Sequence, residues 1–436
     1  MSDDLDIRYG GALAVDTAAL RAVGGRLRGV AGRLSGADED VAQAQRALMT
    51  SAGDLAGLEL AGIRTRIDGM RLEAEDGAAG IALMADAYEL VELRTRHSLL
   101  RPSAANGSAV ADLQYEIARL EASDPRIAAM ADELLATWEK ERFAGLVEQS
   151  DRLALLLPMT APSLGRILAH VAVRARQGVV PPGAVLQGTA DPVALRAVPA
   201  KAPSGAPAGL ADSLRRFPKT PGAQVRVERY TMPNGTRQFV TYVVGTRSSS
   251  FGGADPWDLR SNLQLYANER SASYQATLDA LAEAGVRPGE KVHVVGHSQG
   301  GMIVSRLAAE GPYDVATVIT AGDPIEPSLD EDVLSVQLRH TDDPISALAA
   351  GGSPSGTGAP DSFVVQREAD PIAGLHDAGL PGHHLRTYVE TATMADASGD
   401  ARVEAMDALW DELGTATEIE ATDFIAERKE AVGRKE

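Results

Sequence analysis

The sequence has no cysteine in its 436 residues. This absence excludes disulfides, thiolate zinc sites, iron–sulfur clusters and a cysteine nucleophile. Aromatic residues are also scarce, with 6 Phe, 3 Trp and 9 Tyr. A hydrophobic core must therefore be built mainly from Ala, Leu, Val and Ile, and the hydrophobic content of 44% is enough to build one.

Basic residues are the minority charge, with 42 Lys and Arg against 61 Asp and Glu, which gives a net charge of −19. Binding to nucleic-acid phosphates or to anionic membrane surfaces requires a basic footprint. We therefore expect no nucleic-acid partner and no adsorption to an anionic membrane. At about 100–200 residues per domain, the length predicts two or three domains.

Recognisable secretory and membrane-spanning segments are missing as well. The first residues, MSDDLDIRYGG, are acidic and polar where a signal peptide has a basic and then an apolar region. One apolar stretch, 153–173, has the length of a span, but Pro158, Pro162, Arg166 and His170 interrupt it. We expect two buried helix pieces there and no transmembrane segment. The prediction is a soluble protein, either cytoplasmic or exported without a signal peptide.

Helical periodicity dominates residues 1–178, which we expect to form an all-α domain. The first helix carries apolar residues three or four apart: Leu20, Val23, Leu27, Val30 and Leu34. Further helices are predicted at about 55–100, 109–121 and 126–150. Residues 179–220 are rich in Pro, Gly and Ala and predict a linker with a short helix at 209–216.

Strands and helices alternate over residues 221–400, which predicts an α/β domain with a mostly parallel sheet and helices on both faces. The expected strands are 224–231, 238–244, 291–295, 314–320, 333–339 and 362–368, and the expected helices include 271–284 and 299–310. Pro233-Asn234-Gly235 predicts a hairpin turn between the first two strands. Residues 401–436 are predicted to contain a C-terminal helix over 401–430.

The motif Gly296-His297-Ser298-Gln299-Gly300 carries the strongest chemical signal. It follows a predicted strand immediately and opens a predicted helix, which is the setting of a nucleophile elbow. Such an elbow holds its serine in a strained, exposed conformation and needs small residues two positions before and after it. Ser298 is therefore the candidate nucleophile.

A serine nucleophile needs a histidine base and an orienting acid, and in this setting the chain order is Ser, acid, His. Asp343 follows the predicted strand 333–339, and His383 lies on the loop after the last predicted strand. The neighbouring Asp342 and His384 leave the register open by one residue. Asp323, at the end of the preceding strand, is a rival acid.

An oxyanion hole is expected from the backbone N–H groups of Gln299 and Thr246. The long loop after Thr246 carries Phe251 and Trp257, which are candidate walls of a substrate pocket. The adjacent histidines 383 and 384 have no third ligand at helical spacing, so we expect no metal site and no cofactor.

Residues 209–395 resemble the lipase-like α/β-hydrolases found widely in actinobacteria. The VGHSQGG run at 295–301 carries the resemblance together with shorter pieces, namely Val244-Gly245-Thr246, 255–262, 320–324, Asp343-Pro344-Ile345 and His383-x-Leu385-x-x-Tyr388. The resemblance implies an α/β-hydrolase with serine esterase or lipase activity. It also implies the roles given above for Ser298, Asp343, His383, Thr246 and Gln299.

The N-terminal domain resembles, more loosely, the helical-hairpin modules that accompany such hydrolases and type VII secretion substrates. It carries Tyr88 four residues before Glu92. This resemblance implies a type VII-like export route.

The leading hypothesis is a serine hydrolase that cleaves a small-molecule or lipid ester through an acyl-enzyme on Ser298. One alternative is a secretion-associated binding protein whose helical module is the functional part and whose hydrolase is vestigial. Another is a thioesterase or amidase, because the same triad serves all acyl transfers. The acyl chain, the alcohol and the oligomeric state stay open.

Overall fold

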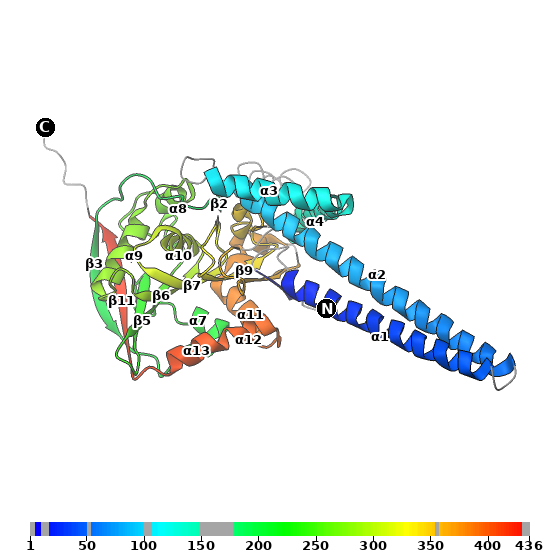
Figure 1. Cartoon of the computed structure of the whole chain (residues 1–436). Helices are drawn as coiled ribbons and strands as arrows, with labels where there is room; N and C mark the ends of the chain where they lie inside the picture. Colours follow the sequence, from blue (N-terminus) through cyan, green and yellow to red (C-terminus); the bar gives the residue numbers. More distant parts are fainter. Residues whose placement is uncertain are drawn as a thin grey trace. The chain divides into compact units, whose positions relative to one another are not determined.

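The computed structural model describes residues 5–9, 17–49, 54–99, 107–148, 178–353, 357–372 and 374–429. The chain forms two compact units. The helical unit comprises Val15–His97 and Ala104–Ala136, and the sheet unit comprises the rest. Along the sequence, the helical unit thus lies between the first few residues of the chain and the main part of the sheet unit, as the colours of Figure 1 show.

The described N-terminal residues include the helices α1 (Thr17–Met49), α2 (Asp54–Leu99), α3 (Gly107–Ser123) and α4 (Pro125–Glu141). They lie close to the predicted ranges, and the predicted apolar stripe of α1 is half-buried. The expected helix at 126–150 is interrupted by a turn at 142–143 before helical residues 144–148. The last residues of α4 belong to the sheet unit.

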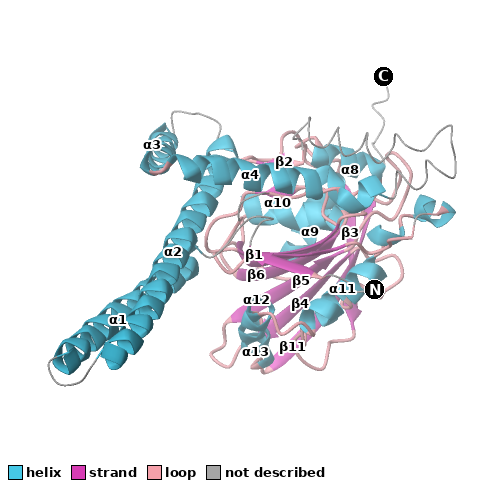
Figure 2. Cartoon of the chain, turned by 90° about the vertical axis from the view of Figure 1, so that its right-hand side faces the viewer, coloured by secondary structure: helices cyan, strands magenta, loops and turns pink. Residues whose placement is uncertain are grey.

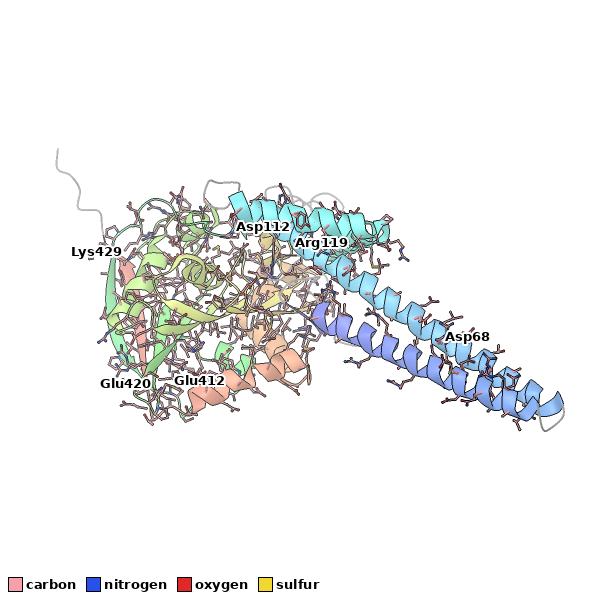
Figure 3. All side chains as sticks on the ribbon, viewed as in Figure 1. Asp68, Asp112, Arg119, Glu412, Glu420 and Lys429 are labelled. Atoms are coloured by element: carbon pink, nitrogen blue, oxygen red, sulfur yellow. The ribbon has the colours of Figure 1, made fainter. Side chains whose placement is uncertain are left out.

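The two long helices run side by side and are linked by ion pairs. Arg64 on α2 binds Asp38 on α1 through two nitrogens, each 2.9 Å from a carboxylate oxygen. Arg21 on α1 binds Asp86 on α2 at 2.7 Å. Asp68 lies on the same stretch of α2 and pairs with Arg71 at 2.6 Å (Figure 3). Because these side chains are partly exposed, each pair contributes little stability, and the two pairs between α1 and α2 mainly fix which faces of these helices meet.

A mixed nine-stranded sheet forms the centre of the sheet unit, in the order β1-β10-β9-β7-β6-β5-β4-β11-β3 (Figure 2). The strands are β1 (Asp6–Tyr9), β3 (Val193–Ala200), β4 (Val225–Thr231), β5 (Arg237–Val243), β6 (Lys291–His297), β7 (Asp314–Ala321), β9 (Leu334–His340), β10 (Phe363–Arg367) and β11 (Glu418–Arg428). Strands β5, β6, β7, β9 and β10 pair in parallel. A separate short pair joins β2 (Val179–Val180) to β8 (Glu326–Pro327).

Helices cover both faces of the sheet, as Figure 2 shows. One face packs against α9 (Ala272–Glu283) and α10 (Gln299–Glu310), with α8 (Leu259–Tyr266) beside α10. The other face packs against α7 (Leu210–Leu214), α11 (Leu385–Asp396), α12 (Ala401–Ala405) and α13 (Asp407–Gly414). On this second face, Glu412 of α13 (labelled in Figure 3) accepts a hydrogen bond from Gln238 of β5 at 2.6 Å. Sequence periodicity predicted this two-sided arrangement.

The prediction of a C-terminal helix over 401–430 was wrong beyond Gly414. The chain there turns into strand β11, which pairs antiparallel with β4 on one side and β3 on the other. The segment EIEATDFIAER contains several β-branched and aromatic residues, which favour a strand. The apolar stripe of the preceding helix concealed this change.

The predicted linker 179–220 also contains an element of the sheet, since β3 forms one of its edges. Pro199 within β3 obscured the strand pattern, and an edge strand tolerates a proline because one side needs no N–H donor. The other edge is β1, a four-residue strand that pairs antiparallel with β10. Strand β1 lies inside the region that was predicted to be all-α. The added antiparallel pairs make the sheet mixed, whereas a mostly parallel sheet was expected.

No helix within the described residues is long and apolar enough to cross a membrane. The apolar stretch 153–173, for which buried helix pieces were expected, lies outside the described residues.

Candidate active site

Ser298 occupies the sharp turn between β6 and α10, with φ 54° and ψ −119°. A non-glycine residue with positive φ is strained, and such strain is stored where surrounding contacts over-determine the backbone. The Ser298 N–H donates to Ala321 O on the adjacent strand β7 at 2.9 Å, which helps to hold the turn. The serine is therefore presented at the carboxyl end of a central parallel strand.

The glycines of the motif make this turn possible. A Cβ on Gly300 would lie 2.0 Å from the Val243 carbonyl oxygen, and one on Gly296 would lie 2.3 Å from the Gly300 carbonyl oxygen. Both obstacles are backbone atoms, which cannot move aside alone. Close contact between β5, β6 and α10 thus requires glycine at both positions.

His383 is within hydrogen-bond distance of both Ser298 and Asp343. Its Nε2 lies 2.8 Å from Ser298 Oγ, and its Nδ1 lies 2.7 Å from Asp343 Oδ2. With the proton on Nδ1, the imidazole donates to the carboxylate and accepts from the serine hydroxyl. Each nitrogen has one partner, so the ring is oriented for transfer of the Ser298 proton.

Asp343 is fully buried and is surrounded by donors. Besides His383, the Tyr388 hydroxyl donates to Oδ2 at 2.7 Å, and the Ile345 N–H donates to Oδ1 at 2.8 Å. Burial alone would raise the pKa of Asp343, but the attraction of His383 and these hydrogen bonds hold the pKa below its ordinary value. The carboxylate therefore stays ionised beside the imidazole.

The structure resolves the one-residue ambiguity in register. Asp342 is buried away from the histidine and accepts hydrogen bonds from the Ala369 and Asp370 N–H groups at 2.9 and 2.6 Å. His384 is exposed and precedes the first residue of α11. Asp342 anchors the neighbouring loop, whereas Asp343 contacts His383.

The rival acid, Asp323, contacts a different set of groups. It accepts hydrogen bonds from Ser305 Oγ at 2.6 Å and from the Ile325 N–H at 3.0 Å. Burial raises its pKa to about 7, against the opposing effects of Ser305 and Arg339. Its carboxylate is held beneath α10 and does not contact His383.

His297 steadies the loop that carries the base. It is half-buried at the cavity, and burial of its ring lowers its pKa to about 3, so the ring is neutral. Its Nε2 donates to the backbone oxygen of His383 at 2.9 Å. The residue before the serine thus binds the loop on which the base lies, a role that sequence reasoning did not assign.

The predicted oxyanion donors lie beside the serine. Gln299 is the first residue of α10, so its N–H has no acceptor within the helix. Across the site, a Cβ on Gly245 would lie 3.0 Å from Ser298 Cβ, which shows how closely this loop approaches. The next residue, Thr246, lines the cavity, and its Oγ1 accepts from Asn262 Nδ2 at 2.8 Å.

A cavity of about 1070 Å³ opens onto Ser298 and His383. Much of its wall is aliphatic or aromatic and comes from α8, α10, the segments after β9 and β10 and the first residue of α11: Leu259, Leu263, Tyr266, Met302, Ile345, Leu348, Leu380 and Leu385. A cavity of this size is at the upper end of the range for small-molecule sites. It can take a substrate with a substantial apolar part.

The two aromatic residues predicted to line the pocket do not line it. Trp257 is fully buried in the core on the α9 and α10 face. Phe251 is 67% exposed on the loop and is not part of the cavity wall. Helix α8, just after Trp257, supplies the wall instead, and its apolar residues Leu259, Leu263 and Tyr266 show the i, i+4, i+7 spacing that could have revealed it.

One group of possible metal ligands occurs among the described residues, formed by Asp370, His376 and Asp377. His376 Nε2 lies 2.9 Å from Asp370 Oδ2 and 3.4 Å from Asp377 Oδ1. The His376 ring thus lies close to both carboxylates, and none of the three side chains contacts Ser298.

Comparison of the sequence with models of known protein families and with curated proteins finds no match, and comparison with solved structures likewise finds none. The geometry of the site is therefore the basis for any functional proposal.

The Tyr388 hydroxyl lets the role of Asp343 be tested. Tyr388→Phe removes one of the hydrogen bonds that lower the pKa of Asp343, so more negative charge is available to stabilise a protonated His383. We expect the acidic limb of the pH–kcat/KM profile to move up by roughly half to one pH unit, and stability to fall by about 1–2 kcal/mol. The pH profile and urea unfolding measure these two effects.

Tyr274→Phe is the matched control for this experiment. Tyr274 is buried in the core on the other face of the sheet and bonds the carboxylate of Glu310. Its loss should lower stability without moving the acidic limb. An unshifted limb in a folded Tyr388→Phe protein would contradict the proposed tuning of Asp343.

Proposed function

We propose that this protein is a serine hydrolase of the α/β-hydrolase type that cleaves carboxylic esters through an acyl-enzyme on Ser298. The observation that carries the proposal is the pair of hydrogen bonds at His383, 2.8 Å to Ser298 and 2.7 Å to Asp343. The strained turn at Ser298, between a parallel strand and a helix, supports it independently.

The geometry suggests the order of events. Ser298 Oγ attacks the ester carbonyl while His383 Nε2 takes its proton, and Asp343 stabilises the resulting imidazolium. The N–H groups of Gln299 and Thr246 stabilise the oxyanion of the tetrahedral intermediate. His383 then gives the proton to the departing alcohol, and water attacks the acyl-enzyme by the same route in reverse.

A fluorophosphonate probe and a panel of p-nitrophenyl esters of increasing chain length test this function. We expect labelling of the wild type at Ser298 between pH 6 and 9, and ester hydrolysis that falls on acidification because a protonated His383 cannot act as base. A folded wild-type protein that is not labelled anywhere in this range would refute the proposal. Thioester and amide analogues in the same panel decide between ester cleavage and the related acyl transfers.

A further inference from the structure

The cavity wall has a charge composition opposite to that of the whole chain. Acidic residues make up 61 of 436 positions, and the net charge is −19. Among the described residues, the cavity lining contains no Asp and no Glu, while Lys219 and Arg247 both belong to it. The exclusion of carboxylates from the wall points to a bound group of negative charge.

The two cations differ in how they are used. Arg247 Nη1 donates to the Ala223 backbone oxygen at 2.7 Å, and its Nε lies 3.3 Å from Asp255 Oδ2. Arg247 is thus occupied in tying the Thr246 loop to the chain around Ala223. Within the described part of the chain, Lys219 has no hydrogen-bond or ion-pair partner, and it is exposed at the cavity. Lys219 is the cation that is available to a ligand.

The backbone that carries Lys219 is firmly held. The neighbouring Thr220 donates through both its N–H and its hydroxyl to Asp423 Oδ2 of β11, at 3.1 and 2.6 Å. Asp423 is buried, and the Ala223 N–H closes a turn onto the Thr220 oxygen at 3.0 Å. The ammonium group therefore extends from a fixed point on the wall, which reduces the loss of entropy on binding.

The cavity also has an apolar region. Leu259 and Leu263 on α8 line it although they are 44% and 59% exposed, and Tyr266 lies one turn further on. The Tyr266 hydroxyl donates to the Leu348 backbone oxygen at 2.9 Å, so the polar atom of this side chain is already satisfied and its ring adds apolar surface to the wall. A ligand that fills this space needs an apolar part as well as a charged group.

We propose that the substrate is an amphiphilic ester that carries an anionic group, a carboxylate or phosphate, which pairs with Lys219 while its apolar part contacts α8. This inference rests on the proposed hydrolase function and names its substrate class. An alternative explanation for the absence of carboxylates is that a negative charge in the wall would destabilise the oxyanion that forms during the reaction. In that case Lys219 would affect neutral and anionic esters alike, whereas an ion pair with the substrate affects the anionic ones alone.

Matched ester pairs test the proposal on the full-length protein at fixed ionic strength. The first pair is p-nitrophenyl octanoate and its analogue with a carboxylate at the end of the acyl chain. The second pair is 1-octanoylglycerol and 1-octanoylglycerol 3-phosphate, which places the anion on the alcohol side. The readout is the anionic-to-neutral ratio of kcat/KM within each pair.

In Lys219→Gln we expect this ratio to fall about fivefold for the pair that matches the natural substrate. The fall should come from a higher KM for the anionic ester, while the kinetics of the neutral esters stay unchanged. Lys219→Glu should lower it further by repulsion. The control is Lys201→Glu, which makes the same charge change at an exposed lysine outside the cavity. A fall in the acyl-side pair assigns the anion to the acid, and a fall in the glycerol pair assigns it to the alcohol.

Any one of three results would overturn the proposal. The first is a constant ratio in both Lys219 variants, and the second is an equal fall in Lys201→Glu. The third is that neutral esters are hydrolysed as slowly, relative to the wild type, as the anionic ones. Each of these occurs with Ser298 still labelled by a fluorophosphonate, which leaves the hydrolase function standing. Absence of labelling and of all ester cleavage in the wild type would instead refute the hydrolase function, and this substrate class with it.

Discussion

Replacing Ser298 by alanine is expected to lower kcat on an activated ester by roughly 10⁵- to 10⁶-fold, with KM little changed. The hydroxyl is the atom that His383 Nε2 faces at 2.8 Å, so its removal leaves no nucleophile while the rest of the site stays in place. The small residual rate would come from the oxyanion donors and from binding. Active-site titration and steady-state kinetics on p-nitrophenyl esters measure the change.

Asp343→Asn and Asp342→Asn form a matched pair that tests the same assembly. Asp343→Asn should cost about 10⁴-fold in kcat, because an amide donor facing Nδ1 disfavours the tautomer that accepts the serine proton. Asp342→Asn alters the anchoring of the Ala369 and Asp370 N–H groups and should leave kcat within about tenfold of the wild type. Equal losses in the two variants would contradict the assignment of Asp343.

Gly300→Ala is expected to be the most destabilising small substitution in the sheet unit. The new Cβ would lie 2.0 Å from the Val243 oxygen and 2.6 Å from the Val243 carbonyl carbon, so α10 would have to separate from β5. We expect a loss of more than about 3 kcal/mol in the free energy of unfolding, with loss of activity because Ser298 moves with the helix. Urea unfolding and fluorophosphonate labelling report the two effects.

The control for this substitution is Gly414→Ala, at the last residue of α13. No atom lies within 4 Å of the position a Cβ would occupy there. Alanine should be neutral or add up to about 1 kcal/mol of stability, because it favours the helix. A Gly300→Ala protein within about 1 kcal/mol of the wild type would show that the helix can separate from the strand at little cost.

The strongest sequence prediction concerned the turn at Ser298. Strand, glycine pattern and helix follow one another within a few residues, so the local pattern contains nearly all the information that this conformation needs. The positions of β6, α10, β7 and β9 followed from the same kind of local periodicity. Asp343 and His383 were placed because both follow predicted strands, and the ends of parallel strands meet at one edge of a sheet.

The sequence predictions that were wrong share a different cause. Strand β11 pairs with β3 and β4, whose partner residues lie about 200 positions earlier in the chain, and no short window of sequence reports such pairing. Trp257 and Phe251 were both candidates for the pocket because they are aromatic residues on one loop. Trp257 is buried in the core and Phe251 is exposed to solvent, so neither lines the cavity, and this difference depends on which distant segments pack against the loop.

The sequence by itself determined that no cysteine can act as nucleophile, that Ser298 lies in a strained turn, and that this turn belongs to an α/β sheet with helices on both faces. These properties depend on residue type and on periodicity over a few turns or strands. Only the tertiary structure decided that Asp343 rather than Asp342 contacts His383, that Tyr388 and His297 steady the site, and that the cavity wall, as far as the described residues form it, contains no carboxylate. Those outcomes depend on which side chains from distant segments approach within about 3 Å of one another, the distance over which hydrogen bonds act.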